Sequence, residues 1–510
     1  MPNYLSPGVY VEEMEAGSRP IEGVGTAVAA FVGLAARGPV DEPILITNWS
    51  QFTQIFGSFI EGSYLAPAVY GYLLNGGGAA YVVRIGANGT GAPAAKAELP
   101  APKDKPGLAG YRVVAREGGV AGNDITVEVA PSSEPGDDTF KLLVSRANRV
   151  EETFDNVTAK KTKNNVATVV KEQSKLITLE ETGSGGPLAA PTTGKVTLAG
   201  GATKAPMRLN RDDYVGNAAD RTGLSVLEAI DTVTMLCVPD LMAAYQQGTI
   251  DLETVQAVQQ AMIAHCELMG DRMAILDPPP GLNAQQIREW RMDKAGYDSK
   301  YAALYWPWIK VFDPVKGEVS SVPPCGYMAG IWGRSDATRG VHKAPANEVI
   351  RGALAPDLVI TRAEQDLLNP NGINCIRAFP GRGVRVWGAR TLSSDPAWRY
   401  VNVRRLFNFI EGSILHGTQW VVFEPNDRDL WARVKRTIEA FLVRSWRDGA
   451  LFGSSPPEAF YVKCDDETNP SEVIDAGQLV VEVGIAPVKP AEFVVFRLAQ
   501  FSGGTSLTEG

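Results

Sequence analysis

The strongest constraint on the fold is a change in the pattern of apolar residues at about residue 87 and a return to the first pattern after about residue 205. Between 27 and 86, an apolar strand, two helical stretches and a second strand follow one another, which is typical of an α/β unit. Residues 87–205 are instead rich in Gly, Ala, Pro, Thr and Lys, with short β-like runs between loops. The α/β pattern resumes near Leu224, so we expect an inserted, solvent-facing β-rich domain within an α/β core.

The apolar spacing predicts individual elements on both sides of this insertion. The strands expected in the core are 28–34, 81–85, 233–238, 273–276 and 302–306, and the helices are 49–56, 67–75 and 251–269. In the last quarter, Asp395-Pro396 indicates a helix start, and a second helix is expected at about 427–447. Two strand-like runs, 478–486 and 492–501, end the chain.

The 510 residues are too many for one core of ordinary size. We predict an α+β, multidomain chain with mixed α/β core domains, an inserted β-rich outer domain and extended N- and C-terminal arms. The predicted boundaries are an N-terminal arm (1–26), a middle α/β domain (27–86 plus 206–385), the inserted domain (87–205), a C-terminal domain (386–490) and a C-terminal arm (491–510).

Charge and hydropathy restrict the partners that we expect. The formal net charge of −9 is modest for this length and shows no bias toward polyanions, so we expect no nucleic acid partner. The first residues lack the basic and apolar stretches of a secretory signal, and no apolar run approaches the roughly 20 residues that span a bilayer. We therefore expect assembly in the cytosol and no membrane insertion.

The sequence has few residues in arrangements that could bind a metal or a cofactor or form disulfides. The five cysteines, at 237, 266, 325, 375 and 464, are widely spaced and form no Cys-x-x-Cys pair, so we expect free thiols and no zinc site. His265 adjoins Cys266, but neighbouring helical residues point about 100° apart and do not converge on one ion. The favoured interpretation is a packed thiol beside a partly exposed imidazole, with no metal and no cofactor.

Catalytic motifs are weak or missing. Gly23-Val24-Gly25 follows no strand and lacks a third glycine, so it is a poor dinucleotide loop. The sequence holds neither a phosphate-binding Gly-x-x-x-x-Gly-Lys-Ser/Thr loop nor a Gly-x-Ser-x-Gly elbow. Asp271 and Asp277 bracket a strand, but an aspartate before three prolines is more often a turn residue than a catalytic carboxylate.

Basic residues gather on the helix expected at 427–447. A solvated helix face is the favoured interpretation, and a face that contacts a protein by charge complementarity is the alternative. The residues singled out for such a contact are Arg428, Arg433, Lys435, Arg436 and Arg444.

Several segments together resemble contractile tail sheath proteins, in particular those of extracellular contractile injection systems and related phage tails. The most recognisable stretch is residues 4–13, Tyr-Leu-Ser-Pro-Gly-Val-Tyr-Val-Glu-Glu. Further matches, in the expected order, are 340–347, 386–392, 423–427 and 484–493. The insertion at 87–205 carries no motif of this family.

The resemblance implies a structural protein and not an enzyme. Such subunits polymerise as helically stacked six-membered rings around an inner tube and contract to drive that tube into a target. Their N- and C-terminal arms add strands to neighbouring subunits. Carried onto this sequence, the strand-exchange residues are Val9, Tyr10, Val11, Leu479, Val481, Val483, Val494, Phe496 and Leu498.

The resemblance also implies partners and a location. The partners are further copies of the chain, the inner tube protein, and baseplate and cap proteins. Together they form a phage tail or a phage tail-like particle, which is either released from the cell or retained in the cytosol. The basic helix is expected to face the inner tube. Three alternatives stay open from the residues themselves: termini that pair within their own subunit, an α/β enzyme with a β-rich accessory domain, and a non-contractile tube or shell protein.

Overall fold

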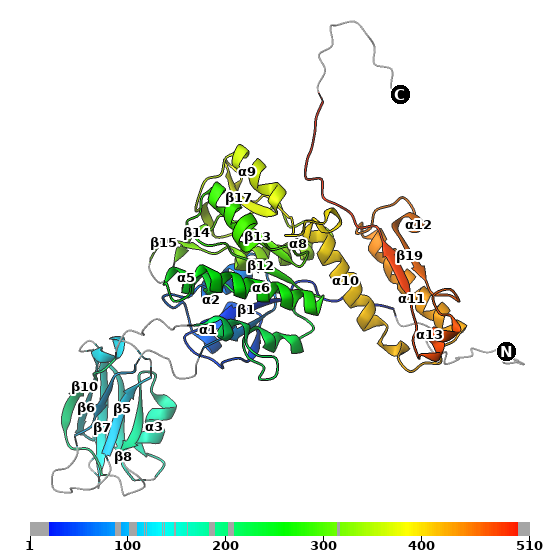
Figure 1. Cartoon of the computed structure of the whole chain (residues 1–510). Coiled ribbons are helices and arrows are strands. Elements are labelled where there is room, and N and C mark those ends of the chain that lie inside the picture. The colour runs from blue at the N-terminus through cyan, green and yellow to red at the C-terminus, as the bar shows by residue number, and fades with distance from the viewer. Residues whose placement is uncertain are drawn as a thin grey trace, which may run out of the picture.

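The computed structural model describes residues 20–86, 93–100, 110–116, 118, 120–134, 136, 138–146, 149–160, 162–182, 189–201, 209–313 and 317–497. A central sheet with flanking helices lies between a β-rich unit and a mainly helical C-terminal region (Figure 1). The described part therefore mixes helices and strands, as the sequence predicts.

The central sheet has eight strands in the order β18-β17-β13-β12-β11-β1-β3-β2. The six inner strands run parallel, and the edge strands β2 and β18 run antiparallel to their neighbours. Their bounds are β1 (Ala29–Gly33), β2 (Pro43–Ile46), β3 (Ala80–Arg84), β11 (Met235–Cys237), β12 (Met273–Leu276), β13 (Ala302–Trp306), β17 (Ile373–Phe379) and β18 (Gly383–Val386). The inner strands are almost wholly apolar because both faces of the sheet are covered.

Helices cover the two faces of this sheet. One face packs α1 (Trp49–Phe56), α2 (Leu65–Leu74) and α8 (Cys325–Arg339). The other packs α4 (Arg211–Val215), η2 (Gly223–Ala229), α5 (Asp240–Gln246), α6 (Leu252–Met269), α7 (Ala284–Glu289), η3 (Trp290–Ala295) and α9 (Arg362–Leu368), which leads into the turn η4 (Asn369–Asn371). A three-stranded sheet of β14 (Ile309–Asp313), β15 (Glu318–Val322) and β16 (Ala353–Pro356) joins the first face.

The β-rich unit has a core of its own, separate from those of the central sheet. Two sheets, β10-β6-β7-β8 and β4-β5-β9, enclose it together with the helix α3. The bounds are β4 (Lys96–Glu98), β5 (Gly110–Ala115), η1 (Val120–Asp124), β6 (Ile125–Pro131), β7 (Thr139–Arg146), β8 (Arg149–Thr158), α3 (Val166–Gln173), β9 (Ile177–Thr182) and β10 (Gly194–Thr197). The β-like runs of the sequence are thus real strands.

The C-terminal region packs two long helices against a small sheet. Ile21, near the start of the described chain, is fully buried in the same cluster. The elements are η5 (Pro396–Trp398), α10 (Val401–Gly417), η6 (Gln419–Val421), α11 (Arg428–Arg447), α12 (Pro456–Ala459), β19 (Phe460–Lys463), α13 (Ser471–Asp475) and β20 (Glu482–Ile485).

Most predicted elements are confirmed within a few residues, and α6 ends at a left-handed Gly270 as expected. The helix predicted to begin at Asp395-Pro396 is wrong in its start, because Asp395 caps only the short turn η5 and α10 begins at Val401. The backbone just before Val401 makes a different hydrogen bond: the carbonyl oxygen of Arg399 accepts from the Thr391 N–H over 2.8 Å. A carbonyl oxygen that accepts from a distant N–H in this way is not used for the hydrogen bonds of a helix.

The strand predicted at 478–486 is also too long. Within it, the backbone N–H and C=O of Val480 both bind the side chain of Asn469, over 2.7 and 3.0 Å. These groups are satisfied by an amide and not by a neighbouring strand, so β20 starts only at Glu482. Residues 492–497, the described part of the last predicted strand, pair with none of the described strands.

Candidate functional site

The carboxyl ends of β1 and β11 meet where the order of the parallel strands reverses, which is the usual ligand position in sheets of this type. Here the carboxylate of Asp240 occupies that position. It accepts hydrogen bonds from the backbone N–H groups of Leu34, Tyr64 and Leu65 and from the Ser63 hydroxyl. A Cβ at residue 33 would lie 2.6 Å from Asp240 Oδ2, so the fit requires a glycine there.

Burial raises the pKa of Asp240 to about 6, against the lowering effect of its hydrogen bonds. The N-terminus of α2, where a phosphate would bind in many α/β enzymes, is thus already satisfied by a carboxylate of the chain itself. This arrangement supports a structural role for the edge that an enzyme would use.

Asp277 plays a similar part after β12, and its assignment as a turn residue is wrong. The side chain is 4% exposed and accepts the backbone N–H of Cys325, at the start of α8, over 2.9 Å. Burial raises its pKa to about 7, although the bond from Cys325 acts in the opposite direction. Asp277 is therefore a buried helix cap.

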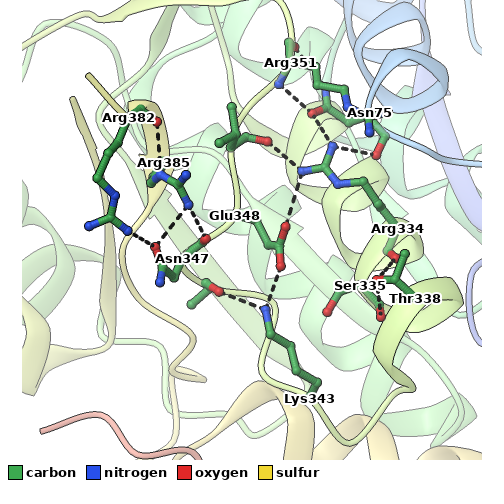
Figure 2. A network of polar contacts seen from close by, with 12 residues as sticks. Asn75, Arg334, Ser335, Thr338, Lys343, Asn347, Glu348, Arg351, Arg382 and Arg385 are labelled. Atoms are coloured by element: carbon green, nitrogen blue, oxygen red, sulfur yellow. Dashed lines mark hydrogen bonds and ion pairs between the residues drawn. The ribbon is translucent and has the colours of Figure 1, made fainter. Parts of the chain in front are cut away.

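The segment 340–351 contains the motif Gly340–Asn347 and is held in place by polar contacts (Figure 2). Lys343 Nζ pairs with Glu348 Oε1 over 2.8 Å, and Arg334 of α8 approaches the same carboxylate at 3.7 Å. Arg385 of β18 donates to the Asn347 carbonyl oxygen over 2.7 Å. These contacts tie α8 to the edge of the central sheet, which gives this motif a structural role.

The thiols and imidazoles take no part in a reactive cluster. All five cysteines are free and buried, as expected. His265 is not partly exposed as predicted: it is 8% exposed, and its Nε2 lies 3.3 Å from Arg272 Nη1. Burial lowers its pKa to about 4, and the neighbouring charge of Arg272 adds to this effect. Among the described residues, no cluster of His, Cys, Asp and Glu is suited to a metal ion, and no helix is long and apolar enough to cross a membrane.

The C-terminal region presents a sheet of only two described strands, β19 and β20, which pair with each other alone along 460–463 and 482–485. Directly after β20, an isolated antiparallel bridge joins Pro487 to Leu451. Val483 lies opposite Val462 and, with Leu479 and Val481, packs partly buried on the C-terminal core. On the other face, the Tyr461 ring lies over Gly484, where a Cβ would come within 2.1 Å of it. The residues expected in a receiving sheet thus lie in or directly before this two-stranded sheet.

The end of the described chain is apolar and exposed. Phe493, Val494, Val495 and Phe496 have exposed fractions of 74%, 69%, 76% and 84%. Four consecutive exposed apolar residues are unusual on a protein surface and mark a contact site. Val9, Tyr10, Val11 and Leu498, the other residues expected in strand exchange, lie outside the described residues.

The basic residues of α11 do not form one free surface. At about 100° per residue, Arg433, Arg436 and Arg444 share one face, whereas Arg428 and Lys435 lie on another. Arg428 pairs with Asp466, and Arg433 pairs with Glu424 over 3.3 Å. Arg444 donates to the Ile21 carbonyl oxygen and thereby holds the N-terminal segment of its own chain.

Sequence reasoning missed one further polar group, in which Glu492 binds Arg390, Asn369 and Tyr400. Both Arg390 and Glu492 lie inside segments that carry the resemblance, 386–392 and 484–493. The motifs thus marked the two residues, but 102 positions separate them and no pattern in the sequence indicates that they pair.

Comparison with known protein families gives two adjacent matches that together cover more than half of the chain. The model of the phage tail sheath protein central domain matches residues 219–392, and that of the phage tail sheath C-terminal domain matches residues 393–501. The chain belongs to the phage tail sheath protein family. This family consists of structural proteins, and the predicted relationship to contractile tail sheaths is confirmed.

Curated relatives of this sheath chain include tail sheath proteins of several phages. The one from Burkholderia phage BcepMu is 24% identical over 527 residues, covering 97% of the chain and 96% of the relative. Those of Vibrio phage KVP40 and Salmonella phage ViI are 27% and 26% identical, and the matches span 36% and 44% of their lengths. The sheath chain thus spans less than half the length of these two relatives.

Solved structures share the fold of the sheath chain. The helical sheath of the anti-feeding prophage in its contracted state is 24% identical, with a TM-score of 0.59, covering 97% of the chain and 99% of that protein. A sheath of the PVC extracellular contractile injection system in its contracted state is 23% identical, with a TM-score of 0.57, 98% coverage of the chain and 99% of that protein. A sheath tail protein from Desulfitobacterium hafniense has a TM-score of 0.59 at 14% identity, covering 90% and 94%.

Proposed function

We propose that this chain is the subunit of a contractile sheath, which polymerises as stacked six-membered rings around an inner tube and shortens to drive that tube into a target. Family membership and the fold shared with contracted sheaths support this proposal. We place the five units predicted from the sequence, 1–26, 27–86 plus 206–385, 87–205, 386–490 and 491–510, in this subunit as arms, middle, outer and inner domains. Assembly takes place in the bacterial cytosol, and the product is part of a phage tail or tail-like particle.

Strand exchange between copies is the join that links the subunits. The observation that carries it is the sheet of β19 and β20, which no third described strand joins, in a chain whose described end is exposed and apolar. A sheet of two strands gains backbone hydrogen bonds from each strand added at its edges. The arms around Val9–Val11 and Val494–Leu498 supply those strands to neighbouring copies.

Contraction follows from the geometry of such a lattice. Contacts that repeat from copy to copy without closing build a helical array, and two arrangements of the same rigid subunits differ in the surface that they bury. The extended array is held by a kinetic barrier, and its shortening releases the difference in contact free energy. The arms keep neighbouring subunits connected while the bodies rotate.

The partners of this sheath are further copies of the chain, an inner tube protein, and baseplate and cap proteins. The α11 face with Arg433 and Arg436 is our candidate for the tube contact, because both side chains lie on the solvent side of the helix. Of the residues named for this contact, Arg444 has a structural task as well, since it holds Ile21.

A truncation tests the proposed exchange. A chain ending at Glu492 lacks all but the first two residues of the C-terminal arm, whereas a matched chain ending at Gly503 keeps Val494–Leu498. We expect the shorter chain to keep the circular dichroism spectrum and melting temperature of the unassembled parent but to form no long tubes by negative-stain microscopy. Tubes of normal diameter that still shorten, built from the chain ending at Glu492, would refute strand donation by this arm.

A further inference from the structure

The C-terminal segment changes its surroundings abruptly at Glu492. Just before it, Val488 is held on both sides: its N–H donates to the Ala450 carbonyl oxygen over 3.3 Å, and its carbonyl oxygen accepts from Asn402 over 3.1 Å. Just after it, residues 493–496 are exposed to solvent. Glu492 is therefore the last described residue that is tied to the body of its own subunit by its side chain.

Four hydrogen bonds converge on the Glu492 carboxylate. Arg390 donates to both oxygens, with Nε–Oε1 at 2.8 Å and Nη2–Oε2 at 2.6 Å. Asn369 Nδ2 donates to Oε1 over 2.7 Å, and the Tyr400 hydroxyl donates to Oε2 over 2.9 Å. The Arg390 and Glu492 side chains are only 10% and 18% exposed, so this bidentate ion pair is shielded from water. We call these four residues the Glu492 clamp.

Hydrogen bonds attach Arg390 of the clamp to the central sheet. The backbone N–H of Arg390 donates to Asn374 Oδ1 over 2.7 Å, and Asn374 Nδ2 donates back to the Arg390 carbonyl oxygen over 2.8 Å. Asn374 belongs to β17 and is fully buried. The position of Glu492 is thus fixed relative to the rigid core and not only to the small C-terminal sheet.

The arm itself does not specify which of its faces points inward. The run Phe493-Val494-Val495-Phe496 places one Phe and one Val on each side of a strand, because side chains alternate. A slip of one residue would therefore exchange two faces of nearly equal apolar content, and such strands pair in more than one register unless something else fixes them.

We propose that the Glu492 clamp fixes the point at which the C-terminal arm leaves its own subunit, so that the donated segment begins at Phe493 and enters the neighbouring sheet in one register. This inference rests on the proposed function, because a register exists only where the arm is lent to another copy. Glu492 acts as a positioning residue: it sets where the strand begins, and the residues after it make the inter-subunit contact.

Photo-crosslinking of assembled sheaths tests the register. A benzophenone side chain, which is also aromatic, replaces Phe496 in the full chain, and mass spectrometry identifies the residues of the neighbouring copy to which it attaches. In the parent background we expect attachment at one position or its immediate neighbour. In Glu492→Gln, whose amide nitrogen would face the Arg390 donors, we expect the fraction at the parent position to fall by about half or more, since two registers become comparable. Glu472→Gln, an exposed residue of α13, is the matched control and should keep the parent pattern.

Proteolysis of the unassembled chain tests the clamp independently of exchange. Thermolysin should cut the parent first after Glu492, whereas in Glu492→Gln cuts between Ile485 and Glu492 should become about tenfold faster, because charge-assisted bonds that resist local opening are lost. Equal crosslink patterns and equal cleavage in both chains would overturn the role of Glu492 and leave strand exchange intact. Absence of inter-subunit crosslinks in the parent would instead refute the exchange itself, and with it the register.

Discussion

Arg405 on α10 and Asp336 on α8 form a bidentate ion pair, with Nη1–Oδ1 at 2.8 Å and Nη2–Oδ2 at 2.6 Å. The two side chains are 4% and 5% exposed, and the guanidinium also lies 4.9 Å from the centre of the Trp332 ring. The pair joins the part of the chain that matches the central sheath domain to the part that matches the C-terminal domain. It therefore ties these two parts of the chain together by a contact that is shielded from water.

Removing one partner of this pair should be strongly destabilising. Arg405→Met leaves the Asp336 carboxylate buried without its counter-charge and the Thr26 carbonyl oxygen without its donor, so we expect a loss of about 3–5 kcal/mol. The measurement is thermal or urea unfolding of the unassembled chain. Arg428→Met, which breaks the exposed pair with Asp466, is the control and should change little. A small effect of Arg405→Met would contradict the role of the pair.

Asp277 should make stability depend on pH. Its pKa is raised in the folded chain to about 7, so the protonated carboxyl is favoured by folding. The stabilisation is present below the ordinary aspartate pKa and is lost as the pH rises through about 7. Asp277→Asn, which keeps an acceptor for the Cys325 N–H, should therefore gain stability relative to the parent between pH 5 and pH 8, on the order of 2 kcal/mol.

Melting temperatures of the two chains at pH 5 and pH 8 measure this difference. Asp475→Asn on α13 is exposed and serves as the control, with parallel curves expected. If Asp277→Asn also runs parallel to the parent, the carboxyl of Asp277 does not titrate in this range.

The basic face of α11 should govern assembly on the inner tube. If this face meets an acidic tube surface, as the proposed contact by charge complementarity requires, reversing Arg433 and Arg436 to Glu places like charges opposite each other, and we expect at least about tenfold weaker association. The assay is the yield of sheath formed on added inner tubes, by sedimentation and microscopy. Reversing Arg149 and Lys175, exposed on the β-rich unit, changes the net charge equally and should leave the yield unchanged. Normal assembly of the Arg433/Arg436 variant would reject this face as the tube contact.

Local patterns in the sequence predicted most helices and strands because they depend on spacing alone. The apolar stripe of α11, from Leu430 to Leu442, is buried as its period indicates, and Asp427 caps that helix. The predictions failed where a side chain binds a backbone group that local patterns assign to another partner. Asn469 binds the backbone of Val480, and Asp277 caps a helix 48 residues further on. Periodicity carries no information on such partners.

The order of the central strands and the polar contacts between units could not be predicted for the same reason. Arg405 and Asp336 are 69 positions apart, and Arg390 and Glu492 are 102 apart. The resemblance located several of these segments, since Arg390 and Glu492 both fall within it, but it did not show that they touch. The residues named for strand exchange followed from the resemblance and stay a prediction, although β19 and β20 pair only with each other among the described strands.

A cryo-electron microscopy map of the assembled tube tests the central claim most directly. We expect the sheet of β19 and β20 in each subunit to be extended by strands from adjacent copies, built from residues around Val9–Val11 and Val494–Leu498. A map in which each terminus folds back onto its own subunit, with neighbouring copies in contact through side chains alone, would contradict the account.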